Sequence, residues 1–153
     1  MQRNPRVPAK FAHLDIGDNC RIDESVEINA RTSEISIGDF TQIAGPADFN
    51  AIGSSIIIGD GCDIAALVTI NCADSHKKVI GLAPNIERLP IVIGDRVFIG
   101  QGATILGGCT IGHHTVIGAG AIIKGEDIIP FSRVRPQLAI IEPGFYILSS
   151  SSS

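Results

Sequence analysis

The sequence predicts an all-β fold, a parallel β-helix in which short strands wind into a column of stacked coils. The first observation is a sixfold repeat, because isoleucine recurs at positions 93, 99, 105, 111, 117 and 123. The second is a longer period, since the repeats that start at Ile16, Ile37 and Ile58 begin at equal intervals along the chain. The third is a composition of 17 glycines, no tryptophan and 5% aromatic residues, which suits a narrow interior with many tight corners.

Each hexad is expected to form one strand and one corner. The isoleucine points inward, and glycine or a polar residue occupies the corner. A second inward position, four places after the isoleucine, is filled by Val97, Ala103, Cys109, Thr115 and Ala121. Three hexads close a triangular coil, and coils stacked about 4.8 Å apart satisfy each other's backbone groups. Because one coil cannot bury its own isoleucines, at least three coils must stack.

The repeat defines the order of segments along the chain. Residues 1–13 carry no period and are expected to form an N-terminal arm. The β-helix domain is expected over residues 14–128, as about five coils that start at Ile16, Ile37, Ile58, Ile93 and Ile111. Each of the first two intervals contains three hexads and a three-residue insertion at one corner.

One long interruption breaks the repeat between Ile70 and Ile91. Residues 71–90 are expected to protrude as a loop, which carries Asp74, His76, Lys77, Lys78, Glu87 and Arg88. A long excursion from an otherwise economical solenoid is usually functional or disordered. The first candidate site residues therefore come from this loop.

The repeat fades again after Glu126. Residues 129–148 are expected to form a short C-terminal cap, with a turn at Pro130, a strand from Arg133 and a final apolar strand from Phe145 to Leu148. The serine-rich residues 149–153 are expected to be a disordered tail.

Charge and hydropathy exclude several classes of function. The formal net charge is -4, and the chain has neither basic runs nor clustered aromatic residues, which argues against nucleic-acid and membrane-surface partners. No apolar run reaches the roughly 18 residues that span a bilayer, and the N-terminus lacks the apolar core of a signal peptide. A cytoplasmic protein is expected.

The four cysteines are expected to be small buried side chains and not disulfides or metal ligands. Cys20, Cys62 and Cys109 each occupy the fifth place of a hexad, where other repeats have threonine, valine or alanine. Cys72 lies at a strand end beside the loop, where a reactive role is the alternative.

Two sequence blocks on either side of the loop resemble a known family. The first is IAALVTI at residues 64–70 and the second is PIVIGDRVFIGQGATILGGCTIG at residues 90–112, with His76 between them. Together with the hexads over residues 14–136, these blocks resemble the hexapeptide-repeat acyltransferases, and more narrowly the galactoside, maltose and polysaccharide O-acetyltransferases. The resemblance implies a left-handed β-helix, acyltransferase activity and a homotrimer.

The resemblance also implies the chemistry of the loop. In that family acetyl-CoA lies in a groove between neighbouring subunits, and a loop histidine acts as general base on the acceptor hydroxyl. His76 holds that place here, and Asp74 is expected to orient its ring. An imidazole suits the step because its unperturbed pKa of about 6.5 lets it accept a proton near neutral pH. The expected acceptor is a sugar, a nucleotide sugar or a polysaccharide unit, and no metal is required.

The same resemblance implies a set of acetyl-CoA contacts. An aromatic ring, at a place where the family usually has tryptophan, would lie beside the pantetheine arm. Small residues would let the thioester approach the backbone, and three basic side chains would meet the phosphates. These residues are Phe98, Gly100, Gly118, Ala119, Lys124, Arg133 and Arg135.

Three other interpretations stay open. The first is N-acetylation of an amino sugar, and the second is a non-catalytic β-helix that serves as scaffold or trimerisation module. The third is a γ-type carbonic anhydrase, whose zinc needs three converging histidines. His113 and His114 are adjacent and residue 118 is Gly118, which argues against that third interpretation. These two histidines are expected at the surface or at a trimer interface.

Overall fold

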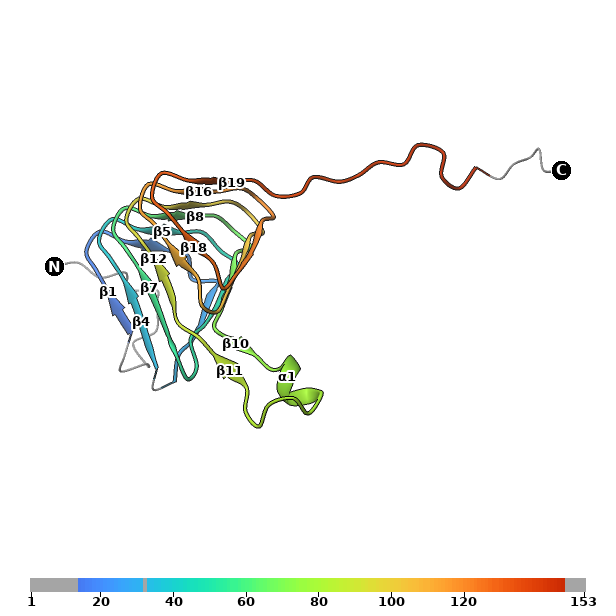
Figure 1. The fold of residues 1–153 in the computed structure, drawn as a ribbon. Coiled ribbons are helices and arrows are strands. Elements are labelled where there is room, and N and C mark those ends of the chain that lie inside the picture. The colour runs from blue at the N-terminus through green and yellow to red at the C-terminus, as the bar shows by residue number, and fades with distance from the viewer. Residues whose placement is uncertain (1–13, 32, 148–153) are drawn as a thin grey trace.

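The computed structural model describes residues 14–31 and 33–147, which form a left-handed parallel β-helix with three faces (Figure 1). The first face contains β1 Leu14–Ile16, β4 Glu34–Ile37, β7 Ser55–Ile58, β12 Ile91–Ile93, β15 Thr110–Ile111 and β18 Asp127–Ile128. The second contains β2 Arg21–Ile22, β5 Gln42–Ile43, β8 Asp63–Ile64, β13 Phe98–Ile99, β16 Val116–Ile117 and β19 Arg133–Val134. The third contains β3 Val26–Asn29, β6 Ala47–Asn50, β9 Thr69–Asn71, β14 Thr104–Leu106 and β17 Ile122–Lys124.

The strand register confirms the periods that the sequence predicts. Ile37 of β4 pairs with Ile58 of β7, so the long interval seen in the sequence is one full coil. After the loop Ile93 pairs with Ile111, and this shorter step lacks the three-residue corner insertion. The last step, from Ile111 to Ile128, is shorter again by one residue and begins a sixth coil where about five were expected.

Stacked isoleucines fill the interior of the column. On the second face one inward row runs through five coils, and each member is at most 2% exposed: Ile22, Ile43, Ile64, Ile99 and Ile117. Burying one such side chain stabilises the fold by about 1.5–3 kcal/mol. Since every coil shares its row with the coils above and below, removing one coil would expose the apolar surface of both neighbours.

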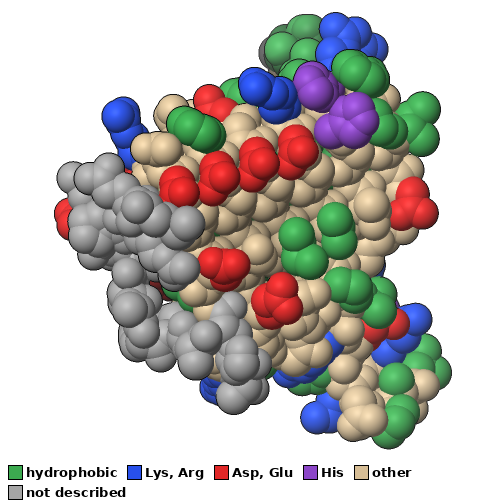
Figure 2. Space-filling view, turned by 90° about the vertical axis from the view of Figure 1, so that its left-hand side faces the viewer, with side chains coloured by type: hydrophobic (Ala, Val, Ile, Leu, Met, Phe, Trp, Pro, Cys, Tyr) green, Lys and Arg blue, Asp and Glu red, His purple; other side chains and the backbone are tan. Residues whose placement is uncertain are grey.

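A ladder of aspartates joins successive coils at the corner between the first and second faces. The Asp39 carboxylate accepts the backbone N–H of Asp18 at 2.7 Å. In the same way, the Asp60 carboxylate accepts the backbone N–H of Asp39 at 2.7 Å, and the Asp95 carboxylate accepts the backbone N–H of Asp60 at 2.8 Å. A Cβ at Gly38 would overlap the Asp60 carboxylate, which explains the recurring sequence Ile-Gly-Asp. Figure 2 shows acidic side chains in a row along the column.

The expected loop replaces one corner between the third and first faces. It leaves the column after β9, returns at β12 and projects outward (Figure 1). Strand β10 Ala73–Asp74 pairs antiparallel with β11 Glu87–Arg88, and the short helix α1 His76–Val79 lies between them. The loop is therefore a hairpin with its own backbone pairing.

The C-terminal region agrees with the expected cap only in part, because the turn at Pro130 and the strand from Arg133 are present. Strand β19, at Arg133, continues the second face of the column as part of the sixth coil. The following residues run away from the column (Figure 1), and residues 143–146 form a turn where a strand was expected from Phe145. The expected arm at residues 1–13, Leu148 and the tail at 149–153 lie outside the described residues. No helix in the described part of the chain is long and apolar enough to cross a bilayer.

The Ile-Gly-Asp corner generates a prediction for stability. We expect Gly38→Ala to lower the free energy of unfolding by about 1–3 kcal/mol, because the added Cβ would also lie 2.7 Å from the Gly59 carbonyl carbon. Urea unfolding measures this change. Ser36→Ala on the outer side of the preceding strand β4 is the control, with an expected change below about 0.5 kcal/mol. Equal stability of the two variants would contradict the packing argument.

Candidate active site

The base of the loop is fixed to the coils on both sides of it. The backbone N–H of Cys72 donates to the Asn50 carbonyl at 3.0 Å, and the Arg88 Nη1 donates to the Ile52 carbonyl at 2.8 Å. On the following coil, a Cβ at Gly107 would lie 2.7 Å from the Cys72 carbonyl oxygen. Glycine at that position therefore lets the column pass close to the start of the loop.

His76 and Asp74 contact each other where the loop begins. The Asp74 Oδ1 accepts the backbone N–H of His76 at 3.0 Å and lies 2.5 Å from its ring Nδ1. An ionised carboxylate can only accept, so Nδ1 is the donor in this contact, and in the neutral imidazole Nε2 then holds the lone pair. Within the described residues Nε2 has no hydrogen-bond partner, and 54% of the His76 side chain is exposed. The ring is thus oriented at one nitrogen and accessible at the other.

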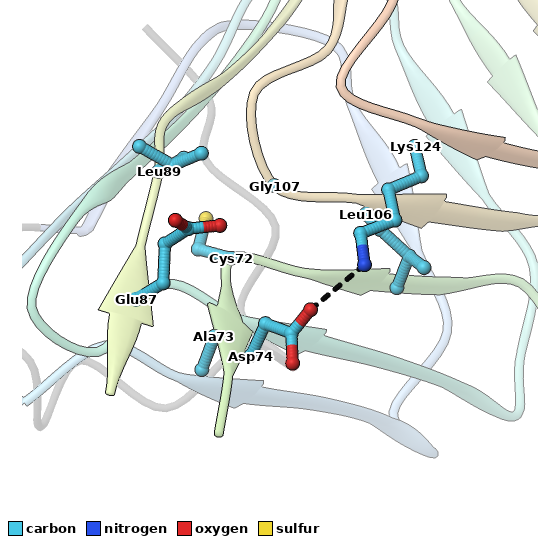
Figure 3. A pocket seen from close by; sticks show the side chains of 8 residues that line it. All are labelled: Cys72, Ala73, Asp74, Glu87, Leu89, Leu106, Gly107 and Lys124. Atoms are coloured by element: carbon cyan, nitrogen blue, oxygen red, sulfur yellow. Dashed lines mark hydrogen bonds and ion pairs between the residues drawn. The ribbon is translucent and has the colours of Figure 1, made fainter. Parts of the chain in front are cut away.

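Lys124 joins this pair from a distant part of the sequence. Its Nζ donates to the Asp74 Oδ2 at 2.8 Å (Figure 3). Lys124 ends β17, where it stacks on Leu106, which in turn stacks on Asn71. The loop departs directly after Asn71, so parallel stacking over two coils brings the lysine to the loop. We call Asp74, His76 and Lys124 the loop cluster.

The charges of the loop cluster stabilise one another. The Lys124 ammonium, together with the two N–H groups of His76, holds the pKa of Asp74 well below its ordinary value. The Asp74 carboxylate in turn raises the pKa of Lys124. Both groups are therefore charged at neutral pH, and the carboxylate remains an acceptor for the ring.

A cavity of about 230 Å³ lies beside the loop cluster, between the hairpin and the column (Figure 3). It is lined by Cys72, Ala73, Asp74, Glu87, Leu89, Leu106, Gly107 and Lys124. Leu106 and Gly107 were not among the predicted site residues. The coil register would have identified them, because both belong to the coil that stacks on the base of the loop.

The other expected acetyl-CoA contacts lie elsewhere on the column. Phe98 of β13 is on the second face, 40% exposed, and pairs with Val116. Arg133 of β19 stacks on the other side of Val116, and the exposed Arg135 follows that strand. The structure thus groups Phe98 with Arg133 in one outer row, but it brings only Lys124 of the expected contacts to the loop.

Gly100, Gly118 and Ala119 lie at the corner between the second and third faces, where their small size has a structural reason. A Cβ at Gly100 would lie 2.5 Å from the backbone nitrogen of Ala119, and one at Gly118 would lie 2.8 Å from Cδ of Pro136. Coil stacking by itself therefore requires glycine at both positions. Close approach of a ligand is not needed to explain them.

His113 and His114 lie at the corner between the first and second faces, where they contact Phe131. Their Nδ1 atoms are 2.9 Å apart, and the Phe131 ring stacks on His114 with centroids 5.1 Å apart. Phe131 was not a predicted contact, because the sequence after Glu126 no longer shows its coil register. Residues 14–31 and 33–147 contain no group of three His, Cys, Asp or Glu side chains that could hold a metal ion.

The cysteines are free thiols, and their burial agrees with a structural role. Cys62, Cys72 and Cys109 are buried, while Cys20 is only partly so. Burial raises the pKa of the Cys72 thiol, which disfavours the reactive thiolate. The thiol also lies 3.4 Å from the Ser55 carbonyl oxygen, so its surroundings favour packing over reactivity.

Comparison with known proteins shows what the repeats and the fold of this chain are similar to. Residues 90–125 match the family model described as bacterial transferase hexapeptide (six repeats). The sequence is also similar to a Schizosaccharomyces pombe protein assigned as an acetyltransferase, with 55% identity over 42 residues. This match spans 28% of this chain and 20% of the length of that protein. A hexapeptide-repeat acetyltransferase from Vibrio cholerae is similar in structure, with 28% identity, a TM-score of 0.66 and coverage of 80% of this chain and 68% of that chain. Galactoside acetyltransferase in complex with coenzyme A gives 30% identity, a TM-score of 0.62 and coverage of 76% and 57%.

The contact of Arg88 with the preceding coil predicts a change in loop dynamics. Arg88→Met keeps an apolar stem against Gly53 but removes the donor to the Ile52 carbonyl. We expect backbone amides of residues 73–88 to exchange hydrogen at least about tenfold faster, measured by mass spectrometry. Lys78→Met in the same loop is the control and should leave exchange unchanged. Unaltered exchange in the Arg88 variant would show that this contact does not hold the loop.

Proposed function

We propose that the protein moves the acetyl group of acetyl-CoA to a hydroxyl group of a carbohydrate, because residues 90–125 match the model of the bacterial hexapeptide transferases. The acceptor is a sugar, a nucleotide sugar or a polysaccharide unit, and the reaction takes place in the cytoplasm. The observation that carries the proposal is the His76 imidazole, oriented through Nδ1 and open at Nε2. The donor is supported by the Vibrio cholerae acetyltransferase, which was solved with acetyl-CoA.

The chemistry assigns one task to each group of the site. The acceptor oxygen attacks the thioester carbonyl carbon while Nε2 of His76 takes the hydroxyl proton. The C–S bond then breaks and the sulfur leaves as a thiolate, which needs no strong acid. Asp74 keeps Nδ1 protonated and stabilises the imidazolium that forms. The developing oxyanion requires hydrogen-bond donors, and backbone N–H groups at a coil corner are suitable.

We propose a homotrimer in which neighbouring columns complete the site. His76 lies on a loop that projects from its own column (Figure 1), whereas Phe98 and Arg133 lie on the second face. One chain does not bring these groups together, but a loop that reaches a neighbouring column can. Partly exposed apolar side chains on the outer faces, Ile57, Phe98, Val116 and Ile122, support such packing.

In this assembly acetyl-CoA lies in the groove between two columns. Phe98 offers an aromatic surface to the pantetheine arm, and the corner at Gly100, Gly118 and Ala119 offers a backbone without bulky side chains. Arg133 and Arg135 meet the phosphates, because both are exposed at the C-terminal end of the second face. This placement keeps the phosphates away from the loop and directs the thioester towards it.

The general-base role predicts the effect of removing the ring. We expect His76→Ala to lower kcat/KM about 10²–10⁴-fold in a thiol-release assay with acetyl-CoA and a panel of sugars and nucleotide sugars. His113→Ala is the matched control and should retain native activity. A clearly smaller loss with an amino-sugar acceptor would identify N-acetylation. A native protein that neither binds nor consumes acetyl-CoA with any acceptor would favour the scaffold interpretation.

The shared site predicts the oligomeric state. Light scattering of the full chain at micromolar concentration should give three times the mass of 16.1 kDa that the sequence implies. Mixing His76→Ala with Arg133→Ala should restore part of the activity, because some mixed trimers then contain one intact site. A monomer, or mixtures no more active than the separate variants, would refute a site shared between subunits.

A further inference from the structure

We propose that Lys124 is a positioning residue that acts on His76 through Asp74, and that it is not a ligand of the acetyl-CoA phosphates. This inference rests on the proposed function, and it assigns a role to Lys124 that differs from the one its sequence position suggests. The structural basis is the placement of three side chains from two distant segments, which share one carboxylate.

The two oxygens of Asp74 have separate tasks. Oδ1 accepts both the backbone N–H and the ring Nδ1 of His76, whereas Oδ2 accepts the Lys124 ammonium at 2.8 Å. A carboxylate that is bonded at both oxygens cannot rotate freely about its Cβ–Cγ bond. The lysine therefore fixes the plane of the carboxylate, and the carboxylate fixes the plane of the imidazole.

Lys124 is suited to this task because it lies on a rigid part of the molecule. It ends β17, which is paired in parallel with β14 through three residue pairs. The loop, by contrast, projects from the column. Two side-chain hydrogen bonds join its described residues 73–88 to other coils, Arg88 to the Ile52 carbonyl and Lys124 to Asp74, whereas the bond from the Ala73 backbone N–H to the Asn71 Oδ1 is local. Arg88 holds the returning strand, so Lys124 is the corresponding anchor of the outgoing strand.

The surrounding charges favour the same pairing. Glu87 of β11 lies opposite Asp74 across the hairpin and lines the same cavity, which makes this side of the cavity acidic. Lys77 and Lys78 of α1 are exposed, and neither has an ion-pair partner within the described residues. Among the described lysines, Lys124 thus alone neutralises a carboxylate of the cavity. Moving its ammonium to a phosphate would leave two neighbouring carboxylates without a counter-charge.

The two roles of Lys124 predict different kinetic changes. A phosphate ligand contributes to binding the donor, so its loss raises the KM for acetyl-CoA and leaves kcat nearly unchanged. A positioning residue contributes to the geometry of proton transfer, so its loss lowers kcat and leaves that KM nearly unchanged. The split between the two constants therefore separates the roles.

We expect Lys124→Met to lower kcat about 10–100-fold with a less than about threefold change in the KM for acetyl-CoA. Lys124→Arg, which keeps a donor for Asp74, should recover most of the lost rate. Lys78→Met is the matched control and should behave as the native protein. The double variant Asp74→Asn, Lys124→Met should be no slower than Asp74→Asn alone, because both changes break one chain of contacts. A raised KM with native kcat, native kinetics throughout, or additive losses would each overturn the proposal.

A second readout does not depend on turnover. Nitrogen-15 NMR of the histidine rings reports which ring nitrogen of His76 carries the proton, and carbon-13 NMR of aspartate carboxyls reports the titration of Asp74. We expect Lys124→Met, but not Lys78→Met, to broaden or shift the His76 Nδ1 signal and to move the Asp74 midpoint upward. A protein without transferase activity would refute the proposed function alone, and the NMR signals would still decide the coupling. Signals unchanged by Lys124→Met would refute the proposed coupling of Lys124 to His76 through Asp74.

Discussion

Parallel hydrogen bonding between coils, kept in register by inward isoleucines, is the constraint on which the whole molecule depends. Because strand side chains alternate between two directions, a shift of one residue would turn every buried isoleucine outward. The fixed register also determines which distant residues meet. It stacks Lys124 on Leu106 and Leu106 on Asn71. The pairing of the coils, and not the sequence of the loop, therefore brings this lysine to the start of the loop.

The column supplies rigidity, and in the proposed function the loop supplies the chemistry. At the corner between the first and second faces, glycine and aspartate pack against the next coil and leave little room for variation. The loop replaces one corner between the third and first faces and is held at Arg88 on one side and at Asp74 on the other. A ring at the end of such a support can be precise in orientation and, in the proposed trimer, still reach a neighbouring column. That combination suits a reaction between two bound substrates.

Much of the fold was predictable because a sixfold period has one structural solution, whereas the site required three-dimensional information. The sixth coil was missed since the step from Ile111 to Ile128 falls one residue short of three hexads and Pro130 resembles the start of a turn. His76 and Asp74 stayed candidates through their place between two matching blocks. The family resemblance implies a phosphate role for Lys124, whereas its contact with Asp74 becomes visible only in the structure, because a sequence motif does not show which way a side chain extends. Glycines are ambiguous for a related reason: close coil stacking and close ligand approach require the same residue.

The central claim is that the loop delivers an oriented imidazole to the thioester of acetyl-CoA. The most direct measurement is a crystal structure of the full chain with coenzyme A bound. The account predicts that the coenzyme lies between two columns, with its sulfur within about 5 Å of Nε2 of one His76, close enough for a hydroxyl group to be held between them. Coenzyme A bound with its sulfur remote from every His76 ring would contradict the account.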